Sequence, residues 1–272
     1  MLLRRREFLG AVLGAAALTG CTTRQDGTPR PVPARVRLGV AEYRPYAFRD
    51  GQGRLTGEVV EVARAVCGAL GRTMTVSLLR AEQVLPGIEA GDLDVVGGLS
   101  IRAANCARVD FSVPDHLSPT ALVVPAGNPK KIGTLTDVVS AGARLAVVEG
   151  SLEVAAARVA GVTDVQAYPS SRLMLRALTG GQADCAAYDD ITLRDLLRNT
   201  PGLELGPPFE PPGGAPRYGF GFRRGDGLRT AFDDVLRDLH ADGGWLRVTT
   251  PFGFTQANIP ATENVRDKAC AR

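Results

Sequence analysis

Carboxylate pairs and two histidines are the side chains of this 272-residue chain that could carry acid–base chemistry or bind a metal. Acidic pairs occur at Asp189-Asp190 and Asp233-Asp234, and the histidines lie at positions 116 and 240. Such groups act in catalysis or metal binding only when they converge in space. The histidines lie far apart in sequence, the cysteine spacings match no zinc motif, and Asp233-Asp234 falls on a predicted solvated helix face. We therefore predict no metal site and no cofactor.

The familiar catalytic signatures are incomplete in this sequence. Residues 98–102, GLSIR, begin like a nucleophile elbow but lack its final glycine. Residues 219–221, GFG, lack the third glycine that a dinucleotide-binding loop needs. A phosphate-binding loop and a His-Glu-x-x-His motif are also missing. The sequence gives no positive reason to predict an enzyme.

The N-terminal residues read as an export signal and a tether. Arginines at 4–6 precede an apolar run at 8–18, which is shorter than the roughly 20 residues that span a bilayer. We therefore interpret residues 1–20 as a signal peptide. Residues 18–21, LTGC, resemble the lipobox of bacterial lipoproteins, which implies lipid on Cys21 and an extracytoplasmic, membrane-anchored protein. Residues 21–34 are polar and proline-rich, and we expect a flexible tether.

The first twenty residues also bear on the export route and on the net charge of the mature chain. Residues 5–9, RREFL, resemble the twin-arginine export signal, although general secretion stays open. Removing residues 1–20 takes away three arginines and one glutamate, so the net charge falls from +3 to +1. A nearly neutral mature chain has no long-range attraction for nucleic acid. We expect no nucleic-acid partner.

Two series of alternating strands and helices predict an α/β fold with largely parallel sheets. The first series has strands at 35–40, 74–79 and 93–97, and the second has strands at 143–148, 165–168 and 183–187. Predicted helices lie between or after them at 57–70, 81–90, 151–160, 170–178 and 189–198. Segments 120–124 and 217–222 bracket the second series and read as crossings between two lobes. A final helix begins at Asp226 and ends at Gly243 and Gly244.

Short blocks between about residues 35 and 255 resemble family 3 of the bacterial extracellular solute-binding proteins. They are YRPY at 43–46, LTGEV at 55–59, LPGIEAGDLD at 85–94, LSI at 99–101, VDFS at 109–112, GS at 150–151, GQAD at 181–184 and YGF at 218–220. The resemblance implies a two-lobed periplasmic-binding-protein type II fold with a hinge and a ligand cleft between the lobes. It predicts one lobe from 35–117 plus 226–272 and the other from 118–225.

Within that family the chain is most similar to ectoine- and hydroxyectoine-binding proteins. The similarity rests on Cys106 ahead of residues 111–112, GSLE at 150–153, PFGFT at 251–255 and the late Cys270. It implies the substrate-binding component of an ABC importer, a monomer that delivers a small zwitterionic or cationic solute to permease and ATPase subunits. An enzyme resembling cyclohexadienyl dehydratase, with Glu149 or Glu153 as acid or base, and a sensor partner are the alternatives.

The resemblance also assigns site residues. Tyr43 occupies an aromatic-wall position, Ser100 a hydroxyl position, and Asp189 the place of an acid for the ligand's amino group. The alternatives are a surface tyrosine, a helix cap, and an N-cap of the next helix, respectively. One of Glu149 and Glu153 is expected to face the cleft. Three other aromatic side chains read as core: Tyr46, Phe48 and Trp245.

The family arginine that pairs a ligand carboxylate is replaced here. Its place holds Asn105, which the resemblance makes an expected ligand-binding residue, while Arg102 stands three residues earlier. Because positions i and i+3 share a helix face, we expect Arg102 to take over the pairing, with Arg44 as the second choice.

The mature chain has four cysteines besides Cys21. An oxidising compartment permits a disulfide, and the tail is too polar to dock by burial alone. We predict a Cys106–Cys270 bridge that ties the tail to the first lobe. Cys67 and Cys185 are predicted to be unpaired, because they belong to different lobes.

Overall fold

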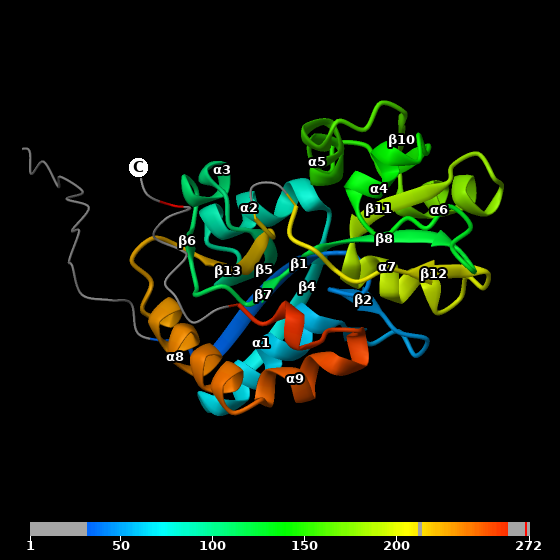
Figure 1. The fold of residues 1–272 in the computed structure, drawn as a ribbon. Helices are drawn as coiled ribbons and strands as arrows, with labels where there is room; N and C mark the ends of the chain where they lie inside the picture. The colour runs from blue at the N-terminus through cyan, green and yellow to red at the C-terminus, as the bar shows by residue number, and fades with distance from the viewer. Residues whose placement is uncertain (1–31, 212–213, 261–269, 271–272) are drawn as a thin grey trace, which may run out of the picture.

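The computed structural model describes residues 32–211, 214–260 and 270. The predicted signal peptide, Cys21 and most of the predicted tether lie outside these residues. The described chain forms two lobes, each built on its own sheet (Figure 1). The predicted α/β fold class is confirmed. Within the described ranges, no helix combines the length and the apolar character needed to cross a bilayer.

The first lobe is built on the sheet β4-β1-β5-β13-β6, with β7 pairing to β13. Strands β1, β4 and β5 run parallel, and β13 is antiparallel to β5. Alternate residues of β1, together with apolar positions of α1, enter one core that also contains Phe232 and Trp245. The elements are β1 (Arg35–Ala41), α1 (Glu58–Ala69), β4 (Thr73–Leu79), α2 (Ala81–Ala90), β5 (Val95–Ser100), α3 (Ala103–Cys106), β6 (Asp110–Phe111), β7 (His116–Leu117), β13 (Arg217–Phe222), α8 (Gly227–Ala241) and α9 (Gly244–Thr249).

The second lobe is built on the sheet β10-β9-β11-β8-β12. Its central strands are alanine- and valine-rich, and helices on both faces bury them in two core clusters. The elements are β8 (Thr120–Pro125), α4 (Leu135–Ser140), β9 (Leu145–Val148), α5 (Leu152–Ala160), β10 (Val165–Tyr168), α6 (Ser171–Thr179), β11 (Cys185–Asp189), α7 (Asp190–Leu197) and β12 (Leu203–Leu205). A small hairpin of β2 (Phe48–Arg49) and β3 (Leu55–Thr56) belongs to neither sheet.

An arginine–aspartate clamp recurs in both lobes. In the first, the Asp94 carboxylate accepts from the Arg37 backbone N at 3.0 Å, and the guanidinium also donates to the Gly91 carbonyl at 2.8 Å. In the second, the Asp184 carboxylate accepts from the Arg144 backbone N at 2.9 Å, and the guanidinium reaches the Gly181 carbonyl at 2.9 Å. Each clamp joins the first strand of a β-α-β-α-β unit to the start of its third strand.

Two connections join the lobes, one between β7 and β8 and the other between β12 and β13 (Figure 1). The second connection returns beside the first, because Phe209 pairs with Thr120, the first residue of β8: Thr120 N donates to Phe209 O at 3.0 Å and Phe209 N donates to Thr120 O at 2.8 Å. The predicted lobe boundary at 225 needs correction, because β13 pairs with β5, β6 and β7 in the first sheet. The crossing therefore comes before β13 and not after it.

Asp233 corrects the interpretation of a solvated acidic pair. Its side chain is buried, accepts a hydrogen bond from the Val113 backbone N at 2.7 Å and pairs with Arg229 at 2.8 Å. Only Asp234 is exposed, with 70% of its side chain accessible. The helix pattern could not show that the loop containing Val113 lies against this face of α8.

The predicted disulfide is confirmed. Cys106, the last residue of α3, is bonded to Cys270, with 5.4 Å between their Cα atoms. Cys67 and Cys185 are free and buried, one in each lobe. Burial raises the pKa of the Cys67 thiol to about 11 and that of Cys185 to about 12, so both remain thiols at neutral pH.

Candidate ligand-binding site

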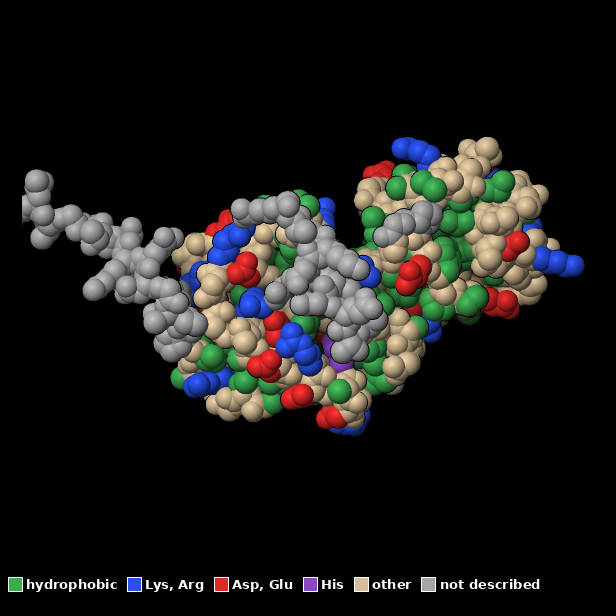
Figure 2. All heavy atoms as spheres, turned by 60° about the vertical axis from the view of Figure 1, so that its left-hand side comes forward, with side chains coloured by type: hydrophobic (Ala, Val, Ile, Leu, Met, Phe, Trp, Pro, Cys, Tyr) green, Lys and Arg blue, Asp and Glu red, His purple; other side chains and the backbone are tan. Residues whose placement is uncertain are grey.

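A cavity of about 520 Å³ lies between the two lobes, and the space-filling view shows the surface indented there (Figure 2). Loops that follow strands of both sheets line it, at the strand ends where open α/β sheets generally bind ligands. Its lining residues come from four stretches of chain together with Ser118: residues 100–102, 150–153, 188–189 and 214–218. A second cavity of about 200 Å³ shares Tyr188, Asp189 and Tyr218 with the first.

The second lobe supplies the acidic wall of this cavity. Glu153 lies in the first turn of α5, is buried, and accepts from the Thr120 hydroxyl at 2.8 Å. Asp189 ends β11 and caps α7, because its Oδ1 accepts from the Thr192 backbone N at 2.8 Å. Asp189 also lines both cavities, so this one residue both caps α7 and lies in the candidate site. Glu149 is exposed and does not line either cavity.

The protonation of Asp189 reflects its surroundings. Burial raises the pKa of this carboxyl to about 6, with a smaller contribution from the charge of Glu153, while hydrogen bonds from Thr192 and Tyr46 act in the opposite direction. A carboxylate held at this value is still mostly ionised at neutral pH. A ligand cation beside Asp189 would stabilise the ionised carboxylate in place of the water that burial excludes.

The first lobe supplies two arginines, Arg102 and Arg217. Arg102 is exposed at the N-cap of α3, and Arg217 is the partly buried first residue of β13. Among the described residues, neither guanidinium forms an ion pair. Sequence reasoning missed Arg217, and only its position at the start of a predicted crossing strand pointed to the cleft.

Asn105, proposed from the family pattern as a ligand-binding residue, does not reach either cavity. It is buried, and its Nδ2 donates to the Ser100 carbonyl at 2.9 Å. Its side chain therefore holds the end of β5, where Ser100 lines the cavity. Arg44, the second-choice base, stacks its guanidinium 3.7 Å from the ring centre of Phe48 and lies outside this cavity.

Tyrosines form the wall between the two cavities. The Tyr43 ring stacks on Tyr46 at 5.8 Å, and the Tyr43 hydroxyl lies 2.8 Å from the Tyr188 hydroxyl of the other lobe. Tyr46, read from sequence as a core residue, lines the smaller cavity and donates to Asp189 Oδ1 at 3.0 Å. Trp245 and Phe48 are buried as predicted. Two hydrogen bonds of this wall therefore cross from one lobe to the other.

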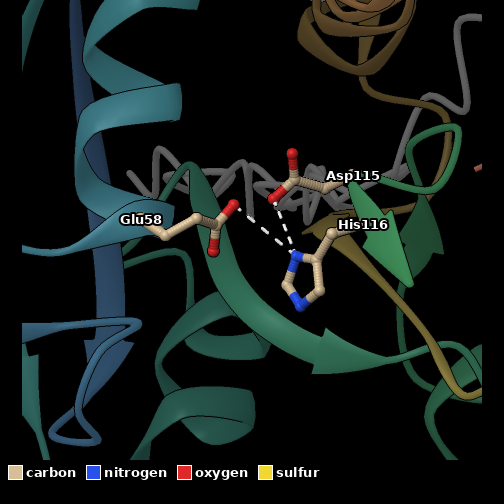
Figure 3. A group of neighbouring side chains, drawn as sticks. All are labelled: Glu58, Asp115 and His116. Atoms are coloured by element: carbon tan, nitrogen blue, oxygen red, sulfur yellow. Dashed lines mark hydrogen bonds and ion pairs between the residues drawn. The ribbon is translucent and has the colours of Figure 1, made fainter. Parts of the chain in front are cut away.

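Glu58, Asp115 and His116 form a buried ionic cluster (Figure 3), and the His116 ring stacks on Tyr46 of this wall. His116 Nδ1 is 3.5 Å from Glu58 Oε1 and 3.4 Å from Asp115 Oδ2. The two histidines, distant in sequence, both reach Asp115, because His240 Nε2 lies 2.9 Å from the Asp115 carbonyl. The three side chains of the cluster each offer one ligand atom within 4.8 Å of the others, which is one fewer than a closed structural zinc site needs.

Burial and the charges of neighbouring members shift the pKa values of this cluster. Burial disfavours the cation, but Glu58 and Asp115 together raise the pKa of His116 to about 10. Burial, together with the neighbouring Asp115, raises the pKa of Glu58 to about 8. Hydrogen bonds from His116 and Trp245 lower the pKa of Asp115 despite its burial. At neutral pH, a charged His116 therefore faces an ionised Asp115.

A model of the bacterial extracellular solute-binding proteins, family 3, matches residues 36–254. A probable amino-acid ABC transporter periplasmic-binding protein of Sinorhizobium fredii is 24% identical over 260 residues, which cover 91% of this chain and 85% of that protein. The L-cystine-binding protein TcyJ of Escherichia coli K12 is 25% identical over 248 residues, covering 88% and 91%.

Solved structures extend the same similarity to the fold. The hydroxyectoine complex of EhuB has 28% identity and a TM-score of 0.61, covering 88% of this chain and 95% of that one. The unliganded, open L-cystine receptor of Neisseria gonorrhoeae has 25% identity and a TM-score of 0.70, covering 80% and 92%. With its two lobes and the charged cavity between them, the chain has a substrate-binding role and belongs to the bacterial extracellular solute-binding proteins, family 3.

Proposed function

We propose that the protein binds a small zwitterionic solute, an ectoine-like compatible solute or a polar amino acid, in the cavity between its lobes. The observation that carries this proposal is the division of charge. Glu153 and Asp189 line one side from the second lobe, and Arg102 and Arg217 line the other from the first. A ligand with a cationic group and a carboxylate would pair with both sides, and such charge-assisted pairs favour closure of the lobes.

The similar proteins support this choice of ligand. The EhuB structure contains hydroxyectoine, and the curated relatives include cystine- and histidine-binding proteins. Each of these ligands carries a carboxylate and a nitrogen that can be positively charged. Partner subunits follow from the same relatives, and we propose an ABC permease and ATPase as partners of a monomeric binding protein.

Calorimetric titration with hydroxyectoine, ectoine, L-cystine, L-histidine, L-arginine and L-glutamine tests the proposal. At least one zwitterion should bind with one-to-one stoichiometry. Putrescine is the matched probe without a carboxylate, and it should bind more weakly because Arg102 and Arg217 then have no partner. Tight binding of putrescine with no binding of any zwitterion would contradict the proposed ligand class.

An enzymatic role is the competing function, since a similar fold occurs in a reconstructed precursor of cyclohexadienyl dehydratase. Within the described residues, the cavity is lined by no histidine and no cysteine, and both of its carboxylates are already hydrogen-bonded, Glu153 to Thr120 and Asp189 to Thr192 and Tyr46. We propose binding without turnover. Conversion of prephenate or arogenate by the purified protein would overturn this.

The location is also a proposal. We propose that lipid on Cys21 anchors the mature protein to the outer face of the cell membrane, because residues 18–21 form a lipobox after an apolar run. A Cys21→Ser protein should lose its partition into the membrane fraction, while a Cys67→Ser protein should keep it. Equal membrane association of both variants would contradict the anchor.

A further inference from the structure

The Glu58–Asp115–His116 cluster is an expensive feature to bury. All three side chains are 3% exposed or less, and removing charges from water costs several kcal/mol per ion unless they are paired. A residue of α9 also holds the cluster in place. The Trp245 indole donates to Asp115 Oδ1 at 2.9 Å. His116 is therefore fixed by partners that take no part in the proposed binding site.

The ring of His116 faces the binding site. It stacks on Tyr218 with 5.0 Å between ring centres and an interplanar angle of 10°, and on Tyr46 with 5.4 Å and 26°. Both tyrosines line the smaller cavity, and Tyr218 also lines the larger one. A cationic imidazole on an aromatic face contributes electrostatic attraction in addition to packing.

Tyr46 connects His116 to the second lobe. Its hydroxyl donates to Asp189 Oδ1 at 3.0 Å and lies 3.5 Å from the Ser118 hydroxyl. Asp189 is the carboxylate that lines both cavities. A chain of direct contacts therefore runs from the buried cluster through one ring to the acid of the site.

We infer that His116, fixed by Glu58 and Asp115, is a positioning residue of the binding site: it sets the rings of Tyr46 and Tyr218 and, through Tyr46, the carboxylate of Asp189. His116 lines neither cavity, so it acts through these side chains. The inference rests on the proposed function only in the role it gives Asp189 as the partner of a ligand cation.

A charge-balanced variant tests the inference without ligand. Asp115→Asn with His116→Phe removes one cation and one anion together and keeps an acceptor for Trp245. Its readout is the NMR shift of the Thr192 backbone amide, which donates to Asp189 Oδ1. This amide should shift as it does in Tyr46→Phe. His240→Phe is the matched control, because His240 contacts Asp115 and Trp245 but has no ring contact with Tyr46 or Tyr218 in the described chain, and it should leave the amide in place.

A ligand measurement sharpens the test. Hydroxyectoine should bind the charge-balanced variant about tenfold more weakly than wild type, which corresponds to about 1.4 kcal/mol, and His240→Phe should bind it within about twofold. Adding Tyr46→Phe should cost less in the charge-balanced background than in wild type, because coupled residues are not additive. Fully additive losses would overturn the inference.

The outcomes separate the two proposals. If wild type binds none of the zwitterions, the proposed function fails, and the Thr192 amide still decides the inference. If that amide stays in its wild-type position in the charge-balanced variant, the inference is overturned. Should that variant not fold, Glu58→Leu, which removes the carboxyl group 3.5 Å from His116 Nδ1 at similar volume, is expected to shift the amide in the same direction, and an unshifted amide would overturn the inference.

Discussion

The two lobes repeat one structural unit and place opposite chemistry on it. The first lobe uses β1-α1-β4-α2-β5 and the second uses β9-α5-β10-α6-β11, with matching strand orders β4-β1-β5 and β10-β9-β11. The clamps also match, Arg37–Asp94 in one and Arg144–Asp184 in the other, each with a second cation nearby, Arg223 or Lys130.

The difference lies at the carboxyl ends of equivalent strands, in the last strand residue, the loop or the first helical turn that follows. After the first strand of the unit, one lobe presents Tyr43 and Tyr46 and the other Glu153. After the third strand, one presents Arg102 and the other Asp189. Because the carboxyl ends of both sheets meet at the cleft, one scaffold used twice yields a site with separated charges. The scaffold fixes where the loops meet, and the loop sequences fix the polarity of the site.

The largest expected effect comes from removing the acid of the second lobe. Asp189→Asn should weaken binding of the best zwitterion by about 1.5–3 kcal/mol, the usual value for a hydrogen bond to a charged group. Glu149→Gln, an acid at the β9 turn outside the cavity, should leave affinity unchanged. Calorimetry on both variants measures the difference. Unchanged affinity in Asp189→Asn would leave this residue only its helix-cap role.

Removing the bases of the first lobe tests the opposite side. Arg102→Ala combined with Arg217→Ala should weaken carboxylate ligands about tenfold or more, because a desolvated carboxylate would lose its partners. Each single change should have a smaller effect. Arg108→Ala, whose guanidinium pairs with Glu89 outside the cavity, is the control. If the double variant binds as wild type does, the division of charge between the lobes does not govern recognition.

The pH dependence of binding should report the acidic lobe. With a pKa of about 6 for Asp189, the carboxyl is roughly nine-tenths ionised at pH 7 and one-tenth at pH 5. Only the ionised form pairs with a cation, so affinity should fall about tenfold on acidification over this range. Asp189→Asn should show a flat profile. An equally steep profile in that variant would assign the titration to another group.

The smallest expected effect concerns the feature that the lobes share. Arg37→Ala and Arg144→Ala should each lower the free energy of unfolding only slightly and by similar amounts, since both guanidinium groups are partly exposed and their carboxylates keep backbone donors. Denaturant unfolding measures both losses. A loss confined to one variant would show that the two clamps are equivalent in geometry only.

Locally determined features could be predicted from the sequence. Apolar periodicity located the main strands and helices, and the strand-end position of Asp189 indicated both a cap and a site residue. The acids of the second lobe could be predicted for the same reason. Glu153 and Asp189 lie in or at the first turn of helices that follow sheet strands, and such strand-to-helix turns are visible in the local sequence.

Features made by long-range packing could not be predicted. His116 and His240 meet at Asp115 because α8 packs against the segment that contains β7, and a one-dimensional pattern does not contain that contact. Arg217 joins Arg102 at the cavity because β13 pairs with β5. Asn105 stands where the family has an arginine, but its amide donates to the Ser100 carbonyl and the residue does not line the cavity.

The Cys106–Cys270 bridge has a topological consequence. It closes a covalent ring with a sequence separation of 164 residues, and the whole second lobe lies on that ring. A single proteolytic cut anywhere in the second lobe would therefore leave one covalently connected molecule. The two fragments should separate on a denaturing gel only after a thiol reductant has been added.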